Sequence, residues 1–289
     1  HGFRGLADAG EQVKDGRDPN TGVPIVSLYG SQKKPTAEHL ANLDLMVFDI
    51  QDVGARFYTY ISTLHYVMEA CAENDLALWI LDRPNPNGHL VDGPVLEAEY
   101  RSFVGMHPIP ILHGLTVGEL GTMIKGKQWL TRAKQCELRI IPCLHYTHGS
   151  EYELPVPPSP NLPNQRAVYL YPSLCLFEGT AVSVGRGTRF PFQLYGHPEL
   201  EGDFTFVPES GPGARYPKLE GQRCVGRNLR LLPMDSLRRQ GFSLQYLIHA
   251  YQQFPEPALF FLKNGFFEKL AGTQTLRQQL ERGWSADQI

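Results

Sequence analysis

The chain has 289 residues, of which 42% are hydrophobic and 20% charged, and these proportions exclude wholesale disorder. Its formal net charge of -3 disfavours a protein that coats nucleic acid or an anionic membrane surface. No apolar run approaches the ~18 residues of a membrane span, and five cysteines are too few for a disulfide scaffold. The chain begins at His1 without a signal segment, so we expect a processed or truncated start.

The first half of the sequence alternates between strand and helix patterns. Apolar residues at helical spacing, among them Ile61, Leu64 and Met68, indicate one helix, and Thr116 with Glu119 forms a capping box for another. Such alternation favours a parallel sheet that is covered on both faces. In chain order, we predict strands over 23–29 and 45–50, a helix over 57–73, a strand over 76–81, a helix over 116–129 and a strand over 137–142.

The pattern changes near residue 150. Five prolines over 154–163 prevent regular structure, and the boundary between two domains is placed here. We therefore predict an α/β domain over 1–150 and an α+β domain over 151–289. In the second domain we expect helices over 165–178, 242–253 and 266–282, a strand with a turn over 180–188, and a strand over 204–208.

Several familiar signatures are missing from the sequence. The stretch 121–127 nearly matches a phosphate-binding loop, but Gln128 stands where a Ser or Thr is required, and the stretch lies in a predicted helix. There is no GxGxxG, GxSxG or HExxH motif, and no metal-ligand pattern is apparent. We expect no cofactor, no metal site and five unpaired cysteines.

The first of several polar clusters follows the strand predicted over 45–50. It contains Asp49, Gln51, Asp52, Arg56 and Tyr58. Hydrogen-bonding side chains this dense exceed what helix capping needs, so they are predicted to belong to a functional site. The structural alternative is that Asp52 caps the next helix while Asp49 and Arg56 form an ion pair.

A second cluster, with Asp82, Arg83 and Asn85, directly follows the strand predicted over 76–81. Two prolines stiffen this loop, and the alternative is a turn-rich connection in which Asn and Asp only close turns. Since the carboxyl ends of parallel strands meet at one edge of a sheet, both clusters are expected to line one cavity.

Four further residues complete the candidate site: His113, Asn161, Glu178 and Arg186. Apolar neighbours would desolvate Glu178 and raise its pKa toward the range of a general acid. Two alternatives remain: Glu178 is a surface residue at a helix end, or Arg186 keeps it ionised so that it binds rather than donates a proton. The whole set suits a polyhydroxylated, anionic small substrate, whose acidic group an arginine would bind.

Nine motifs occur in order along the chain: HGFRG (1–5), SLYG (27–30), VFDIQDVGARFYTYI (47–61), LDRPNPNG (81–88), VDGP (91–94), SFVGM (102–106), PSPNLP (158–163), YPSLCLFEGT (171–180) and GRGT (185–188). Together they resemble a bacterial family associated with exo-acting β-N-acetylmuramidases, which are glycoside hydrolases of peptidoglycan turnover. The resemblance implies a Rossmann-like domain without nucleotide, a smaller C-terminal domain, and a site in the cleft between them. It also implies a peptidoglycan-derived saccharide as substrate and a periplasmic or secreted location.

In this family the resemblance implies catalytic roles for Asp49, Asp82 and Glu178. Glycoside hydrolysis usually uses two carboxyl groups, although the acetamido oxygen of an N-acetyl sugar can itself attack. Family members carry a glutamate immediately before HGFRG, and nothing precedes His1 here, so the site is expected to be whole only if that residue exists in the molecule. Substrate contacts are implied for His1, Arg4, Gln51, Asp52, Arg56, Tyr58, Arg83, Asn85, His113, Asn161 and Arg186, with Arg4, Arg56, Arg83 and Arg186 as candidates for the lactyl carboxylate of muramic acid.

Two other functions remain open at this stage. One is a non-catalytic protein that binds cell-wall sugars on the same fold, and the other is a metal-dependent amidase or deacetylase of the same polymer. A chelator would inhibit that metalloenzyme but not a glycosidase.

Overall fold

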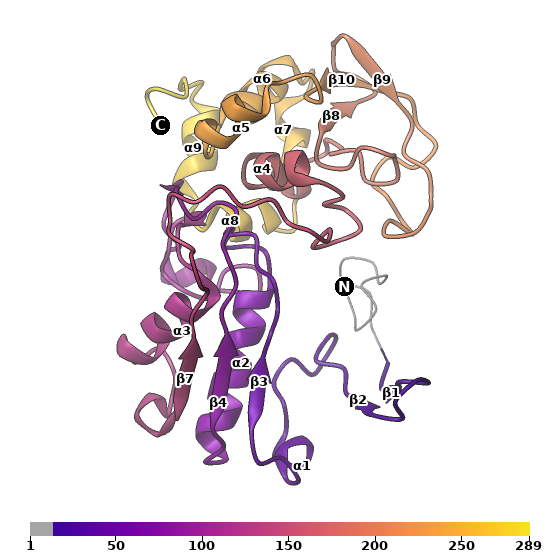
Figure 1. The fold of residues 1–289 in the computed structure, drawn as a ribbon. Helices are drawn as coiled ribbons and strands as arrows, with labels where there is room; N and C mark the ends of the chain where they lie inside the picture. Colours follow the sequence, from indigo (N-terminus) through magenta and orange to yellow (C-terminus); the bar gives the residue numbers. More distant parts are fainter. Residues whose placement is uncertain (1–13) are drawn as a thin grey trace.

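The computed structural model describes residues 14–289 (Figure 1). The N-terminal part contains a three-stranded parallel sheet of β3 (Met46–Phe48), β4 (Leu78–Leu81) and β7 (Leu138–Ile141), in the order β3-β4-β7. The register aligns Val47 with Trp79 and Trp79 with Arg139. Three of the predicted strands, and their parallel direction, are therefore confirmed.

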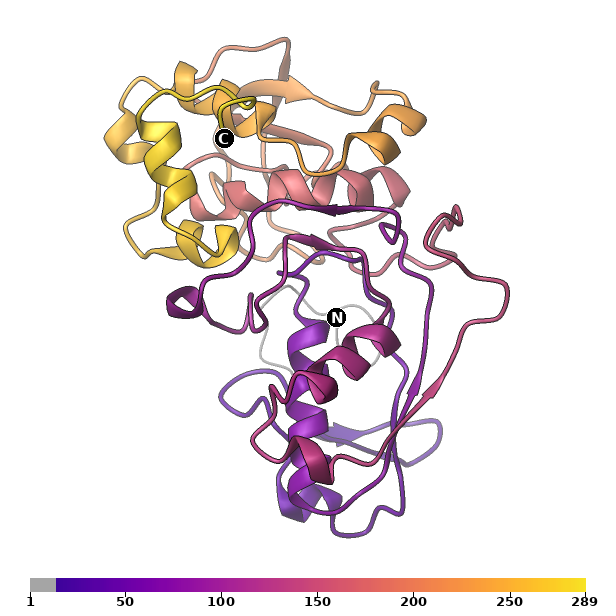
Figure 2. The same ribbon diagram turned by 90° about the vertical axis from the view of Figure 1, so that its left-hand side faces the viewer.

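Two helices cover one face of this sheet, α2 (Tyr60–Glu73) and α3 (Val117–Gly126). Figure 2 shows both on the same side of the strands. Their apolar residues form a core with the inward side chains of β4, and Leu64, Leu78, Ile80 and Leu120 are all fully buried. Both helices were predicted, and the capping box of Thr116 that begins α3 is present.

The expectation that helices cover both faces of the sheet is wrong for the residues that the structure describes. On the opposite face, Val47 is 46% exposed, and Arg139 is exposed with its guanidinium 4.6 Å from the centre of the Trp79 ring. This alternation of buried and exposed positions along the strands is typical of a sheet that packs on one side.

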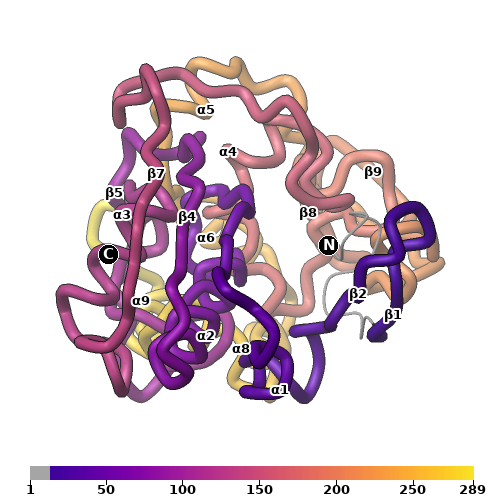
Figure 3. Tube along the Cα trace, turned by 60° about the horizontal axis from the view of Figure 1, so that its bottom comes forward, coloured from indigo at the N-terminus to yellow at the C-terminus, as the bar shows by residue number. Residues whose placement is uncertain are grey.

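The strand predicted over 23–29 is not part of this sheet. Only β2 (Pro24–Ile25) forms there, and it pairs antiparallel with β1 (Gly16–Arg17) in a short ribbon that stands apart from the parallel sheet (Figures 1 and 3). Val23 and Val26 are largely exposed, so the apolar composition of the stretch does not reflect burial. The chain then passes α1 (Ala37–Leu40) before it enters β3.

The C-terminal part mixes helices with an antiparallel sheet, which agrees with the predicted α+β class, but the strand predicted over 180–188 does not form. The sheet has the order β8-β10-β9, and α4 (Gln165–Leu174) continues directly into the 3₁₀ helix η3 (Cys175–Gly179). One predicted helix, 266–282, is interrupted at Gly272, whose φ of 81° ends α8. The remaining elements are β5 (Val91–Asp92), η1 (Ala98–Tyr100), β6 (Leu112–His113), η2 (Ala133–Gln135), β8 (Leu194–His197), β9 (Phe204–Phe206), β10 (Cys224–Asn228), α5 (Met234–Gln240), α6 (Gln245–Gln253), α7 (Pro257–Phe260), α8 (Phe266–Ala271) and α9 (Thr275–Glu281).

Arg56 joins the two parts of the molecule from a fully buried position. Its Nη1 donates to the carbonyl oxygens of Pro94 (2.6 Å) and Ile109 (2.8 Å), and its Nη2 to those of Leu270 (2.9 Å) and Ala271 (2.7 Å). Burial lowers the pKa of this guanidinium to about 10. The prediction that Arg56 contacts substrate is therefore wrong, because four backbone carbonyls occupy it and no part of it is exposed.

All five cysteines are unpaired, as predicted, and four of them are buried. Among residues 14–289, no helix is both long enough and apolar enough to cross a membrane.

Candidate active site

The two polar clusters at the carboxyl ends of β3 and β4 do lie side by side. Arg83 Nε donates to Asp49 Oδ1 at 2.7 Å, and Gln51 Nε2 donates to the carbonyl of Pro84 at 2.8 Å. Asp49 therefore pairs with Arg83 and not with Arg56. Both side chains of this pair are over 40% exposed, so solvent screens the interaction.

Asp82 serves as an N-terminal partner of helix α3. Its carboxylate accepts hydrogen bonds from Thr116 Oγ1 at 2.7 Å, from Gly118 N at 2.8 Å and from Arg83 N at 3.0 Å. A carboxylate at this position also interacts favourably with the helix dipole. The sequence suggested a catalytic role for Asp82. The geometry instead shows a structural role at the N-terminus of α3.

Asn85, Asp52 and His113 are all buried. Asn85 Nδ2 donates to the carbonyl of Leu115, and Asp52 Oδ2 accepts from Gly54 N at 2.7 Å. Asp52 therefore closes a turn instead of capping α2. The Nε2 atom of His113 lies 3.6 Å from Asp52 Oδ2, and both residues are at most 5% exposed.

A cavity of about 440 Å³ lies between the N-terminal and C-terminal parts. Four of the predicted site residues line it: Tyr58, Asn161, Glu178 and Arg186. The other expectation, that the clusters at 49–52 and 82–85 line one cavity together, is not met here, because none of their residues is among the described residues that line this one.

Aromatic rings form much of the cavity wall. Tyr171 makes edge contacts with Phe57, Tyr58 and Phe192, with ring centroids 5.3, 6.0 and 5.0 Å apart. The hydroxyl of Tyr58 donates to the carbonyl of Pro158 at 2.6 Å, which ties the wall to the proline-rich segment. Rigid aromatic walls with a few polar groups are typical of small-molecule sites.

Glu178 and Arg186, which both line this cavity, form an ion pair. Glu178 lies in η3, and Arg186 Nε donates to its Oε1 at 2.9 Å. The next residue, Gly179, lets α8 pack closely, since a Cβ atom there would lie 2.4 Å from the Cα of Phe267. The two side chains are 24% and 22% exposed, so the pair is accessible from the cavity but not freely solvated.

Glu178 is ionised in this setting. Burial alone would raise the pKa of its carboxyl, but the charges of Arg186 and Lys218 outweigh this effect and hold the pKa below its usual value. The expectation of a raised pKa is therefore wrong, because neighbouring cations and not apolar contacts decide the charge of Glu178. This result favours the alternative in which Glu178 binds substrate as a carboxylate instead of donating a proton.

Lys218 is a residue of this site that sequence inspection missed. Its Nζ donates to the carbonyls of Phe177 (2.9 Å), Thr180 (2.6 Å) and Val182 (3.1 Å), and so holds together the segment that carries Glu178. These three bonds use all the donors of an ammonium group. Nothing in its neighbourhood along the chain indicates this, since its partners are about 40 residues away.

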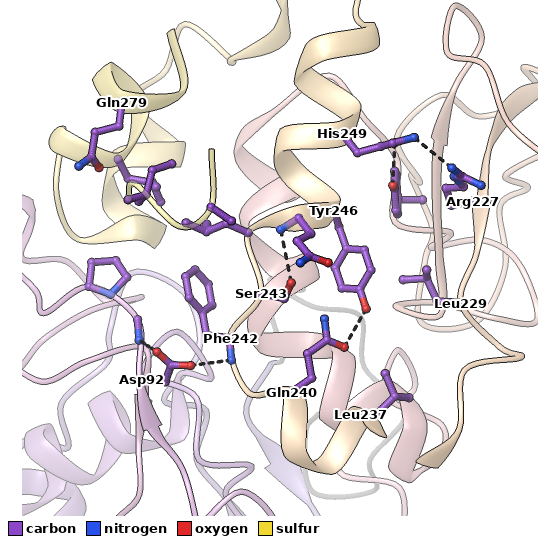
Figure 4. A pocket seen from close by; sticks show the side chains of 18 of the residues that line it. Asp92, Arg227, Leu229, Leu237, Gln240, Phe242, Ser243, Tyr246, His249 and Gln279 are labelled. Carbon is purple, nitrogen blue, oxygen red and sulfur yellow. Dashed lines mark hydrogen bonds between the residues drawn. The ribbon is translucent and has the colours of Figure 1, made fainter. Parts of the chain in front are cut away.

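A larger cavity, about 1270 Å³, lies elsewhere, beside α5, α6 and α9 (Figure 4). The carboxylate of Asp92 accepts from the backbone of Gly93 and Phe242 there, and Tyr246 donates to Gln240. None of the predicted site residues that the structure describes lines it. Size alone therefore does not identify the site, and the smaller cavity, which the Glu178–Arg186 ion pair lines, is the better candidate.

His1 and Arg4 lie outside the described residues, and their predicted roles remain predictions. Within residues 14–289, no three His, Cys, Asp or Glu side chains are grouped so that they could hold a metal ion.

Comparisons with known proteins agree over the whole chain. The family models of exo-beta-N-acetylmuramidase NamZ match twice, the N-terminal model over residues 1–166 and the C-terminal model over 169–289. Peptidoglycan beta-N-acetylmuramidase NamZ of Bacillus subtilis (strain 168) is 41% identical over 306 residues, which cover 100% of this chain and 73% of that protein.

Two crystal structures of DUF1343 family proteins from Bacteroides fragilis NCTC 9343 are also similar. One has a TM-score of 0.90 and 50% identity, covering 99% of this chain and 77% of the other, and the second has a TM-score of 0.80 and 29% identity, covering 92% and 74%. The cavity with Glu178 therefore lies in a protein that belongs to the exo-β-N-acetylmuramidase NamZ family.

Proposed function

We propose that this protein is a glycoside hydrolase that releases terminal N-acetylmuramic acid from peptidoglycan fragments. Membership of the family supports the reaction, and the ionised Glu178 in the aromatic cavity is the observation that carries the assignment of the site. A cavity of about 440 Å³ is of a size for one or two sugar rings, as an enzyme that acts from the end of a chain requires.

Glu178 acts in this proposal as a carboxylate. Cleavage of a glycosidic bond passes through a transition state with positive charge on the sugar ring. A carboxylate at the ring stabilises that charge, or orients the acetamido group when its oxygen attacks. Arg186 fixes the carboxylate through one oxygen, so the second oxygen is available to the substrate.

Aromatic and amide groups supply the remaining recognition. The edges of Tyr171 and Phe192 bound an apolar space that accommodates the methyl group of an acetamido substituent. Asn161 lines the same cavity, although its Nδ2 already donates to the carbonyl of Gly213. We therefore propose that Asn161 shapes the wall of the cavity and that its Oδ1 accepts a hydrogen bond from a sugar hydroxyl.

The fold and location follow the same proposal. We infer that the parallel sheet with α2 and α3 is part of a Rossmann-like domain. We expect this domain to bind no nucleotide, because the chain has no GxGxxG motif. We also propose that the boundary between the two domains lies near residue 150. Peptidoglycan lies outside the cytoplasmic membrane, and we propose a periplasmic or secreted location for the protein.

Hydrolysis of two chromogenic substrates tests the function. The wild-type protein should release the chromophore from a β-N-acetylmuramide, with much lower activity on a β-N-acetylglucosaminide, and EDTA should have no effect. The Glu178→Gln variant should lose about 10²–10³-fold in turnover, because the charge that stabilises the transition state is removed, and should keep its melting temperature. Glu201→Gln, at an exposed position, is the matched control.

Three outcomes would count against the proposal. Binding of N-acetylmuramic acid without turnover would indicate the non-catalytic sugar-binding protein. Inhibition by EDTA would indicate the metal-dependent amidase or deacetylase. A Glu178→Gln variant with reduced stability but normal activity per folded molecule would remove Glu178 from the catalytic residues.

A further inference from the structure

Lys33 lies on the wall of the cavity that the N-terminal part supplies. It follows the β1–β2 ribbon, and Leu28, Tyr29 and Gly30 of the same segment line the cavity with it. Its Nζ lies 4.3 Å from the centre of the Phe103 ring, which is another lining residue. The half-buried ammonium is therefore held over an aromatic face at the edge of the cavity.

Lys33 has no acidic partner among the residues that the structure describes. The adjacent Lys34 differs, since its Nζ bonds to Glu73 at 2.9 Å and to Glu69 at 3.3 Å and does not line the cavity. The two consecutive lysines thus have different roles. Lys34 anchors the segment to α2, whereas the ammonium of Lys33 is available to bind an anion in the cavity.

The described arginines that were candidates for an acidic substrate group are committed elsewhere. Backbone carbonyls surround Arg56, and Arg83 pairs with Asp49 outside the cavity. Arg186 does line the cavity, but its charge is balanced by Glu178 in direct contact. A second carboxylate placed at Arg186 would lie next to that of Glu178, and two like charges so close together repel each other.

We propose that Lys33 binds the lactyl carboxylate of N-acetylmuramic acid and so lets the enzyme distinguish this sugar from N-acetylglucosamine. The inference rests on the proposed function, since it names the substrate group that this wall recognises. The lactyl group is attached to O3 of the ring, away from the anomeric carbon at which the bond breaks. Lys33 and Glu178 line the same cavity from the N-terminal and the C-terminal part of the chain, so recognition and reaction are assigned to different parts of its wall.

Kinetics on the muramide and the glucosaminide test this assignment. Lys33→Gln should lower kcat/KM for the muramide about 10–100-fold, mainly through KM, because a charge-assisted hydrogen bond is lost. It should leave kcat/KM for the glucosaminide unchanged, and Lys33→Arg should restore most of the preference. Lys34 is next in the chain but lies outside the cavity. Lys34→Gln should therefore leave the ratio of kcat/KM for the muramide to kcat/KM for the glucosaminide as in the wild type.

A substrate in which the lactyl carboxylate is converted to a neutral amide gives an independent readout. The wild type should prefer the charged form, and Lys33→Gln should treat both forms alike. If Lys33→Gln leaves the ratio of kcat/KM for the muramide to kcat/KM for the glucosaminide unchanged, the inference is overturned. Arg186 or Arg4 would then be the candidate that binds the lactyl carboxylate.

Failure of the proposed function can be told apart from failure of this inference. If the wild type hydrolyses neither substrate, the reaction is wrong, and calorimetric binding of free N-acetylmuramic acid then decides the role of Lys33. Weaker binding in Lys33→Gln than in Lys34→Gln would support it, and equal binding, or no binding by any variant, would refute it.

Discussion

Replacement of Arg56 by methionine should destabilise the folded protein strongly. Methionine fills a similar volume but cannot donate hydrogen bonds, so the carbonyls of Pro94, Ile109, Leu270 and Ala271 lose a charged donor at once. Each hydrogen bond to a charged group contributes about 1.5–3 kcal/mol. The cost of keeping the guanidinium out of water, visible in its lowered pKa of about 10, offsets part of this sum.

We therefore expect the free energy of unfolding to fall by about 3–5 kcal/mol, the range for breaking a buried charged interaction. Urea unfolding followed by tryptophan fluorescence and by circular dichroism measures it. Since two of the four carbonyls belong to α8 and two to the N-terminal part, the variant should also unfold over a broader or split transition.

A control and a refuting result complete this test. Arg223 is exposed and makes no side-chain hydrogen bond in the described structure, so Arg223→Met should change the unfolding free energy by less than about 0.5 kcal/mol. A loss below about 1 kcal/mol in Arg56→Met would show that its hydrogen bonds are not what holds the two parts together.

Two further predictions concern pH. Lys218→Met removes a cation that lowers the pKa of Glu178, so the acid limb of the kcat/KM profile should move to higher pH; an unmoved limb would exclude this coupling. Burial lowers the pKa of His65 to about 4 and that of its partner His107 to about 3, with the two ring nitrogens 3.0 Å apart. Because the unfolded chain takes up protons near pH 6.5 and the folded pair does not, stability should fall from pH 7 to pH 5 by about 2 kcal/mol per histidine. Urea midpoints at both pH values measure this loss, and His107→Gln should reduce it; equal midpoints in the wild type would contradict the reasoning.

The elements that rest on local pattern could be predicted from the sequence. Apolar spacing identified α2, and the reciprocal bonds of Thr116 and Glu119 begin α3 as their spacing indicates. The contact between Asp49 and Arg83 follows from the parallel pairing of β3 and β4, which brings the ends of both strands together. In each case a rule of short range, or of strand direction, is sufficient.

The tasks of single polar residues could not be predicted in the same way. Arg56 stands among polar neighbours in the sequence, yet its partners lie 38 to 215 residues away, and they decide that it is structural. Lys33 and Lys34 are indistinguishable by composition, and only the positions of Glu69 and Glu73 on α2 separate them. Which partners a charged group meets is a property of the tertiary fold.

The cavity has a consequence for how activity arises during folding. Its walls come from segments near residues 28–33, 57–59, 103–104, 159–162, 171–192 and 266–270, so no half of the chain contains a working site. A cell-wall hydrolase built in this way should become active only once α8, which contributes Phe266 and Leu270 to the cavity, has docked. Recovery of activity on refolding should accordingly lag behind formation of the parallel sheet, which closes with β7 at residue 141.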